Sequence, residues 1–193
     1  MDVMIDLETI GQQSDAGMAT IAAIEFDRDK DVLSLTDGRY PESVDELHSI
    51  FNCFYVRVKL KSLAQAGFNW SKETTEWWLA QDPEVRFEAL DAKPRTMVNQ
   101  ALYDFYHWYP MGGVAWSHGA SFDLVIMRNG LERFEMTTPW KFWDERCTRT
   151  LYDLAGLDGQ TQKQMRGNNH HHALFDCYDQ IVMLQESFRR LRV

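Results

Sequence analysis

Two patterns along the chain predict a single α/β domain. Short apolar runs of strand length, separated by glycine and polar turns, occupy the first 60 residues, whereas longer apolar runs at helical spacing dominate the rest. With 193 residues, of which 45% are hydrophobic, the chain has enough apolar surface for one sizeable core. We therefore expect one domain over residues 1–193, without an internal repeat or linker.

The first third of the chain is predicted to be rich in strands. The apolar runs predict a three-strand meander at 3–8, 18–26 and 32–35, a helix at 44–51 and a strand at 54–60. Polar residues alternate with apolar neighbours in the last of these runs, as expected for a strand with one exposed face.

A small helical elaboration is predicted for residues 62–92. Ser71 suits the N-cap of a helix that carries Trp77 and Trp78, and Pro83 suits the first turn of the next helix. Adjacent indoles on one helix point in different directions, so we expect at least one of these tryptophans to be a core residue rather than a base-stacking group.

The remainder is predicted to alternate between helices and a short strand. The expected elements are a helix at 95–108, a buried strand at 114–116 and helices at 122–134, 145–154 and 173–191. The polar stretch 156–170 is predicted to be a mobile loop, in which Lys163 and Arg166 would be drawn down by a substrate phosphate or would simply be surface charges.

Composition excludes several classes of protein. No apolar run is long enough to cross a bilayer, and the N-terminus reads as a strand rather than a leader, so we expect a cytoplasmic protein with no membrane partner. Three scattered cysteines indicate reduced thiols. The net charge of −9 argues against a broad basic face for nucleic acid, although metal ions bound by acids would still attract one phosphodiester.

Asp6 and Glu8 are the first candidates for a metal site. They are two residues apart on a predicted strand, so both side chains point to the same face while Leu7 points to the other. Two neighbouring carboxylates repel each other unless a cation or hydrogen-bond donors compensate them, and their oxygens suit Mg²⁺ or Mn²⁺. A solvated strand end is the alternative explanation for this pair alone.

Three further candidates come from the C-terminal half. Asp123 follows Ser121, a candidate helix cap, at a strand-to-helix junction, where an acid also stabilises the helix dipole. Asp176 is expected in the first turn of the last helix. His171 is five positions earlier, about 140° away around a helix axis, so it should lie in the preceding loop to share a site with Asp176. A solvated histidine cluster is the alternative explanation.

Three ordered motifs resemble those of a known superfamily. The segments Asp6-Leu7-Glu8-Thr9, His118-Gly119-Ala120-Ser121-Phe122-Asp123 and His171-His172-Ala173-Leu174-Phe175-Asp176 resemble the exonuclease motifs of the DEDD superfamily, histidine subtype (DEDDh). Segments 71–78 and 139–143 are similar to the group that contains phage DNA exonuclease A and the mycobacterial-type 3′→5′ exoribonucleases. The resemblance implies a ribonuclease H-like fold, with a mixed central sheet and helices on both faces.

The same resemblance implies a function and a set of site residues. The chain would be a 3′→5′ exonuclease that acts on single-stranded RNA or DNA 3′ ends, with RNA favoured, and releases nucleoside 5′-monophosphates. Two Mg²⁺ ions, for which Mn²⁺ would substitute, would be held by the four carboxylates, with His171 as the base. Related proteins suggest a homodimer. The implied ligands are Asp6, Glu8, Asp123 and Asp176, and the implied substrate contacts are Thr9, Ile10 and Phe122.

Two alternatives stay open at this point. His172 lies four residues before Asp176, where the tyrosine subtype places its tyrosine. In the first alternative, His172 rather than His171 would therefore be the base. A non-catalytic ribonuclease H-like module, which binds nucleic acid or accompanies a polymerase in proofreading, is the other alternative; Gly119, where proofreading relatives usually carry Asn, weakens a proofreading assignment.

Overall fold

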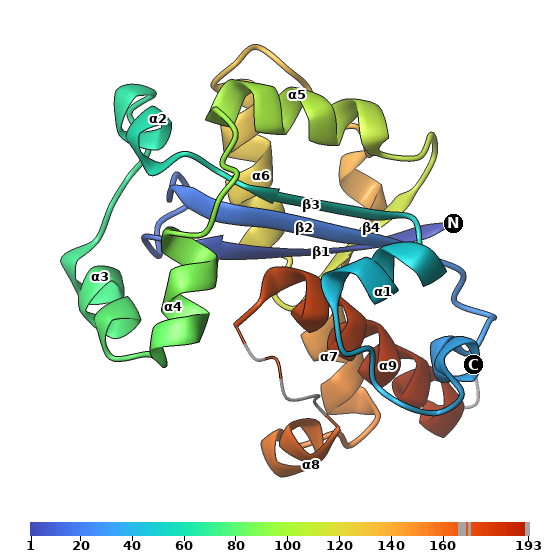
Figure 1. Cartoon of the computed structure of the whole chain (residues 1–193). Coiled ribbons are helices and arrows are strands. Elements are labelled where there is room, and N and C mark those ends of the chain that lie inside the picture. Colours follow the sequence, from blue (N-terminus) through green and yellow to red (C-terminus); the bar gives the residue numbers. More distant parts are fainter. Residues whose placement is uncertain (166–168, 170, 192–193) are drawn as a thin grey trace.

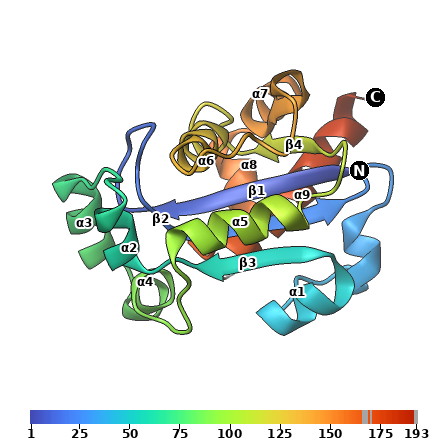
Figure 2. The same cartoon turned by 90° about the horizontal axis from the view of Figure 1, so that it is seen from above.

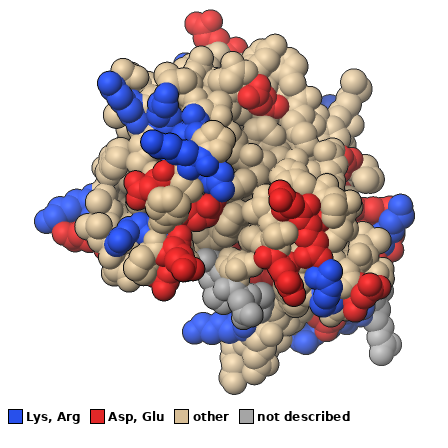
Figure 3. Space-filling model, in the orientation of Figure 1, with Lys and Arg blue, Asp and Glu red and all other residues tan. Residues whose placement is uncertain are grey.

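The structure, a computed structural model, describes residues 1–165, 169 and 171–191 (Figure 1). Arg166 and His170 therefore lie outside the described residues. None of the helices within the described part of the chain combines the length and the apolar character needed to cross a membrane. On the face seen in Figure 3, Lys and Arg gather locally over α2 and the segment that follows α4, whereas Asp and Glu gather over α1.

A five-stranded mixed sheet forms the centre of the molecule, with the strand order β3-β2-β1-β4-β5. β1 (Asp2–Thr9), β2 (Met18–Phe26) and β3 (Cys53–Arg57) form an antiparallel meander. On its other side, β1 pairs in parallel with β4 (Val114–Ser117), which pairs in parallel with β5 (Glu145–Cys147). The predicted α/β class is confirmed.

Helices cover both faces of this sheet (Figures 1 and 2). α5 (Val98–Trp108) and α6 (Asp123–Glu132) cover one face, while α1 (Val44–Ile50), α7 (Thr148–Leu154) and α9 (Ala173–Leu191) cover the other. The arrangement is consistent with a ribonuclease H-like fold. α9, predicted with the same bounds, is long and mostly buried, so helical periodicity identified it clearly.

The alternation of side chains along β1 separates two hydrophobic cores. Val3, Ile5 and Leu7 pack with α5 and α6, whereas Met4 packs with α9. Asp6 and Glu8 share the face of Met4, as period-2 geometry requires, and therefore lie on the α9 side of the sheet.

Short helices lie at the end of the sheet where β1 terminates, over most of the segment predicted as a helical elaboration (Figure 1). They are α2 (Leu60–Gln65), α3 (Lys72–Leu79) and α4 (Pro83–Leu90). Ser71 caps α3 by accepting a hydrogen bond of 3.0 Å from the backbone N–H of Thr74. Pro83 occupies the first turn of α4, where its missing N–H costs nothing.

The prediction of a strand at 32–35 was wrong, because this segment forms the 3-10 helix η1 (Val32–Thr36). Asp31 caps it through the N–H of Leu33, and the N–H of Val32 donates to Gln185 Oε1 of α9 at 3.0 Å. These side-chain partners satisfy backbone groups that a strand would have paired with a neighbour. The third strand of the meander is β3, which ends at Arg57 rather than continuing to residue 60.

Three predictions in the C-terminal half also need correction. The helix predicted at 145–154 begins only at residue 148, since residues 145–147 form β5 after the 3-10 helix η2 (Phe142–Asp144). The predicted cap Ser121 is wrong, because Phe122 is the N-cap of α6 and makes no side-chain cap bond. Within the predicted loop 156–170, α8 (Gly159–Gln164) forms a helix capped by Asp158.

Candidate active site

A cleft of about 420 Å³ opens beside the C-terminal half of β1. All five residues predicted for catalysis line this cleft, namely Asp6, Glu8, Asp123, His171 and Asp176. They come from β1, α6, the turn before α9 and α9 itself, so segments that are far apart in sequence meet at one point.

β1 delivers two of the carboxylates. Asp6 lies opposite Ala22 and Glu8 opposite Thr20 on β2, and the pairing shifts between Glu8 and Thr9, where β1 ends in an irregularity. Such shifts in pairing change the direction in which side chains point, and they often occur beside functional sites. Gln180 of α9 donates to Asp6 Oδ1 at 2.7 Å and holds this carboxylate in place.

Helix starts deliver the other two carboxylates. Asp123 is the first residue of α6 and is 5% exposed, so its carboxylate is almost fully removed from bulk water. Asp176 lies in the first turn of α9, and its backbone N–H donates to the carbonyl of His172 at 3.0 Å. The short connection between the histidines and α9 therefore has a defined geometry.

The electrostatics of the cleft favour protonated acids when no cation is present. Burial raises the pKa of Asp6 and of Glu8 well above their usual values, and repulsion from Asp176 and Asp123 raises both further. Burial also raises the pKa of Asp123 to about 7, although neighbouring backbone N–H groups and the Arg149 guanidinium oppose this rise. Burial and repulsion between neighbouring acids thus disfavour the ionised forms of Asp6 and Glu8, and burial disfavours that of Asp123.

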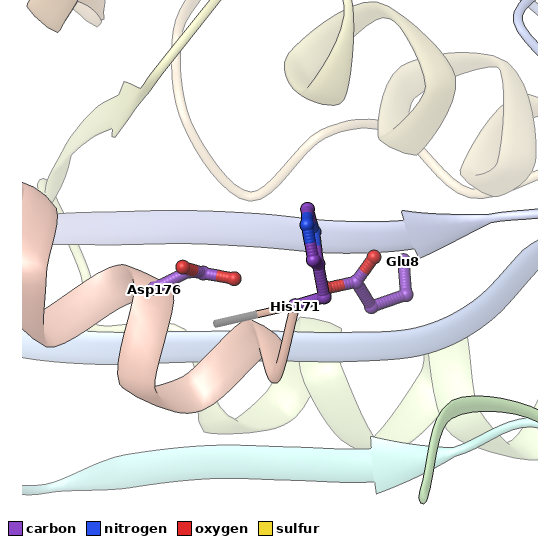
Figure 4. Close-up of side chains that lie close together, drawn as sticks. All are labelled: Glu8, His171 and Asp176. Atoms are coloured by element: carbon purple, nitrogen blue, oxygen red, sulfur yellow. The ribbon is translucent and has the colours of Figure 1, made fainter. Parts of the chain in front are cut away.

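Glu8, His171 and Asp176 come close enough to bind one ion together (Figure 4). Each offers a ligand atom within 4.8 Å of those of the other two. His171 adopts the left-handed backbone conformation, with φ +60°, which is strained for a non-glycine residue, and its ring meets Trp77 edge-on at 5.0 Å. The prediction that His171 precedes α9 in a loop is confirmed.

His172 points into a different environment. Its ring stacks on Tyr55 at 4.8 Å and lies edge-on to Phe175 at 5.0 Å, and its Nε2 is 3.6 Å from Glu88 Oε1. Burial lowers the pKa of His172, while Glu88 partly opposes this shift. Of these two adjacent histidines, His171 lines the carboxylate cleft and His172 does not, although both line a neighbouring pocket with Glu88.

Two of the three predicted substrate residues reach an adjoining cleft of about 370 Å³, which Thr9 and Phe122 both line. The third, Ile10, is 3% exposed and packs in the core. Trp78 is also buried, as expected for one of the tryptophans, and its Nε1 donates to the carbonyl of Thr9 at 2.8 Å. The helical elaboration is thereby attached to the end of β1.

The carboxylate cleft is also lined by residues that were not anticipated as site residues, namely Leu7, His118, Arg149 and Gln180, and by Trp77, which was weighed as a core or base-stacking residue. Gln180 follows Asp176 by four positions on α9, so the i, i+4 rule alone placed it beside the predicted ligand. Arg149 had no such signal, because its position depends on where α7 begins.

The donor set suits hard divalent cations. Each of the four acids offers carboxylate oxygens, the ligand type that Mg²⁺ and Mn²⁺ prefer, and the set contains no thiolate. Burial raises the pKa values of Asp6, Glu8 and Asp123, and repulsion between acids adds to the rise for Asp6 and Glu8, so a bound cation would stabilise the ionised forms. The residues present therefore fit a site for divalent metal ions.

Comparisons with known proteins agree with this geometry. The family model of the Rv2179c-like 3′-5′ exoribonuclease domain matches residues 1–188. The exodeoxyribonuclease of Enterobacteria phage T4 is 28% identical over 214 aligned residues, which cover 97% of this chain and 89% of the phage protein. The chain belongs to the Rv2179c-like 3′-5′ exoribonuclease domain family and is a 3′→5′ exonuclease.

Proposed function

We propose that this exonuclease removes nucleotides from single-stranded 3′ ends by metal-dependent hydrolysis and releases nucleoside 5′-monophosphates. The observation that carries the proposal is the cluster of four carboxylates in one cleft, where burial and repulsion between the acids raise the pKa values of Asp6 and Glu8, with the imidazole of His171 beside them. Family membership supports a nuclease, and the cluster supports dependence on metal ions.

Asp6, Glu8, Asp123 and Asp176 would hold two Mg²⁺ ions, or Mn²⁺ in their place. When bound, these ions would lower the pKa of a water molecule and balance charge on the leaving 3′-oxygen. Gln180 keeps the carboxylate of Asp6 oriented through its hydrogen bond of 2.7 Å, so this ligand does not need to be ordered when ions bind.

His171 is proposed as the general base. It would take a proton from the water that attacks the phosphorus, while the bond between phosphorus and the 3′-oxygen breaks and the 3′-oxygen gains a proton from solvent. Its position next to Glu8 and Asp176 supports this role, and a neutral imidazole is a suitable base near pH 7. The contacts of His172 with Tyr55 and Glu88 argue against the alternative base.

Thr9 and Phe122 are proposed to contact the terminal nucleotide, because both line the cleft that adjoins the carboxylates. Ile10 is left out of this proposal, since its side chain is buried in the core. RNA is the favoured substrate on the description of the family, whereas the phage relative is described as an exodeoxyribonuclease. We further propose that residues 1–193 act as one domain in the cytoplasm, as a homodimer, which sedimentation would test.

A time course on 5′-labelled single-stranded RNA and DNA tests the proposal. Wild type and Asp6→Ala are incubated with Mg²⁺, with Mn²⁺ or with EDTA. We expect stepwise shortening from the 3′ end by the wild type with either metal, faster on RNA, and none with EDTA or with Asp6→Ala. Failure of the wild type to shorten any strand with either metal would exclude the proposed function, and equal rates on both strands would remove the RNA preference.

A further inference from the structure

Arg149 is a cation that lines the carboxylate cleft without being a candidate metal ligand. It is the second residue of α7, its side chain is exposed, and it shares the cleft with His118 and Asp123. We propose that Arg149 binds a phosphate of the substrate strand next to the one that is cleaved. The proposal rests on the proposed function, because it requires a polynucleotide in this cleft.

The backbone of Gly119 provides the space in which the guanidinium lies. Gly119 has φ +127°, a conformation that favours glycine, and a Cβ placed there would lie 3.5 Å from Cζ of Arg149. A methyl group would just touch the guanidinium, so any longer side chain would compete with it for the same space. Glycine at this position thus keeps Arg149 beside the cleft.

The guanidinium is available for an anion. Residues 1–165, 169 and 171–191 provide no salt-bridge partner or hydrogen-bond partner for the guanidinium of Arg149, which lowers the pKa of Asp123. Once two divalent cations balance the four carboxylates, Arg149 remains as an excess positive charge at the cleft. The planar guanidinium matches the oxygens of a phosphate with two parallel hydrogen bonds.

The position of Arg149 distinguishes a neighbouring phosphate from the reacting one. The group of ligand atoms that lie within 4.8 Å of one another comprises Glu8, His171 and Asp176, and Arg149 enters the cleft from α7, next to Asp123. The aromatic side chains that line the cleft, Trp77 and Phe122, come from α3 and from the start of α6. The geometry therefore assigns the sugar–phosphate backbone to the α7 side of the cleft.

Equilibrium binding tests this assignment without requiring turnover. The probes are 5′-labelled single-stranded RNAs in which one phosphate at a time is replaced by a neutral methylphosphonate, measured in Ca²⁺ with strand integrity checked on a gel. The proteins are wild type, Arg149→Gln, Arg149→Lys and the control Arg146→Gln. Arg146 is an exposed arginine three residues earlier, whose guanidinium donates to the carbonyl of Trp143 at 2.6 Å.

We expect Arg149→Gln to weaken binding of the unmodified strand about tenfold, Arg149→Lys less, and Arg146→Gln not at all, since hydrogen bonds to charged groups are the stronger ones. One methylphosphonate near the 3′ end should weaken strand binding by wild type about tenfold. The same replacement should leave strand binding by Arg149→Gln unchanged, because this variant already lacks the contact between residue 149 and that phosphate. The proposal would be overturned if Arg149→Gln bound the unmodified strand as tightly as wild type. It would also be overturned if each methylphosphonate reduced the affinity of wild type and of Arg149→Gln by the same factor. Tight binding without strand shortening in Mg²⁺ would exclude only the proposed function.

Discussion

Two groups of charged residues on the same face of the sheet differ in how their acids are compensated. The carboxylate cluster, defined by Asp6, Glu8, Asp123 and Asp176, lies at β1. The Glu88 cluster, defined by Glu88, Tyr55, Arg57 and His172, lies two strands away. Cross-strand pairing connects them, because Tyr55 lies opposite Ala22, the partner of Asp6, and Arg57 lies opposite Thr20, the partner of Glu8.

The donors to Glu88 outweigh the effect of its burial, which is not the case for Asp6 and Glu8. Glu88 Oε1 accepts hydrogen bonds of 2.6 Å from the hydroxyl of Tyr55 and from Nε of Arg57. Burial alone would raise the pKa of Glu88, but these donors outweigh it and lower the pKa below its usual value. The pKa values of Asp6 and Glu8 move in the opposite direction. An acid whose donors outweigh its burial stabilises the fold, whereas burial and mutual repulsion dominate for Asp6 and Glu8, as expected if these acids are held for a cation.

The two adjacent histidines divide between these clusters. His171 takes a strained left-handed conformation and lies beside Trp77 and the carboxylates, while His172 is half-buried against Tyr55 and Glu88. Because the strain at His171 persists only if the surroundings hold it, the packing of His172 contributes to the direction in which His171 points.

Asp6→Asn should have the largest effect on activity and an opposite effect on stability. We expect cleavage to fall by at least about 10³-fold, since a proposed metal ligand is lost. In EDTA the same variant should unfold at a higher denaturant concentration than wild type, because one repelling carboxylate is removed. Initial rates and urea unfolding in EDTA measure the two effects. A metal-free Asp6→Asn protein that is less stable than wild type would contradict the contrast between the clusters.

His171→Ala and His172→Ala should separate catalysis from stability. His171→Ala is expected to lower kcat by about 10²–10⁴-fold with little change in unfolding free energy, as for other positioned bases. His172→Ala should instead destabilise the fold by about 1–3 kcal/mol, because it removes a buried ring and a partner of Glu88. Cleavage rates and melting curves of both variants show which histidine serves catalysis and which serves stability. If His172→Ala alone stops cleavage at unchanged stability, the base is His172.

Glu88→Gln should reduce stability more than it reduces cleavage. Removing the charge weakens the hydrogen bonds from Tyr55 and Arg57, for which we expect a loss of about 1–3 kcal/mol in unfolding free energy. Because the pKa of Glu88 is lowered in the folded state, its contribution is present above its unfolded pKa and disappears as the pH falls through the folded pKa. Unfolding of both proteins at pH 7 and pH 3 measures this difference, and an equal deficit at both pH values would speak against it.

Metal ions should stabilise the protein increasingly as the pH rises. The raised pKa values of Asp6, Glu8 and Asp123 mean that the metal-free folded state retains protons which the unfolded state releases, so its stability falls as the pH rises from about 4 towards 7. Metal binding requires ionised carboxylates, and it therefore offsets the loss of stability that the metal-free protein suffers as the pH rises. We expect the difference in Tm between Mg²⁺ and EDTA to grow by several degrees from pH 5 to pH 8. A constant difference would contradict this account.

Sequence reasoning succeeded where local pattern determines structure. β1, β2 and α9 are long and regular, and period-2 geometry placed Asp6 and Glu8 on the correct face. Sequence reasoning failed where contacts with residues far away in the chain determine the local structure. Residues 32–36 form a 3-10 helix against Gln185, which lies 153 positions later in the chain, and the three-residue β5 exists only because β4 lies beside it.

The same division applies to the site. The motif order pointed to the four acids and His171, which line one cleft, and helical spacing from Asp176 would have indicated Gln180, which was not anticipated. The positions of Glu88 and Arg149 could not be predicted from the sequence, because they depend on how α4 and α7 pack against segments that are remote in sequence.

Titration with Mn²⁺ tests most directly whether the carboxylate cluster is held for cations. Binding is followed for wild type, Asp6→Asn and Glu88→Gln by the signal of free Mn²⁺, with a nucleoside 5′-monophosphate present. We expect two ions per chain for wild type and for Glu88→Gln, and loss of at least one of them in Asp6→Asn. A wild type that binds no Mn²⁺, or an Asp6→Asn protein that titrates like wild type, would contradict the account.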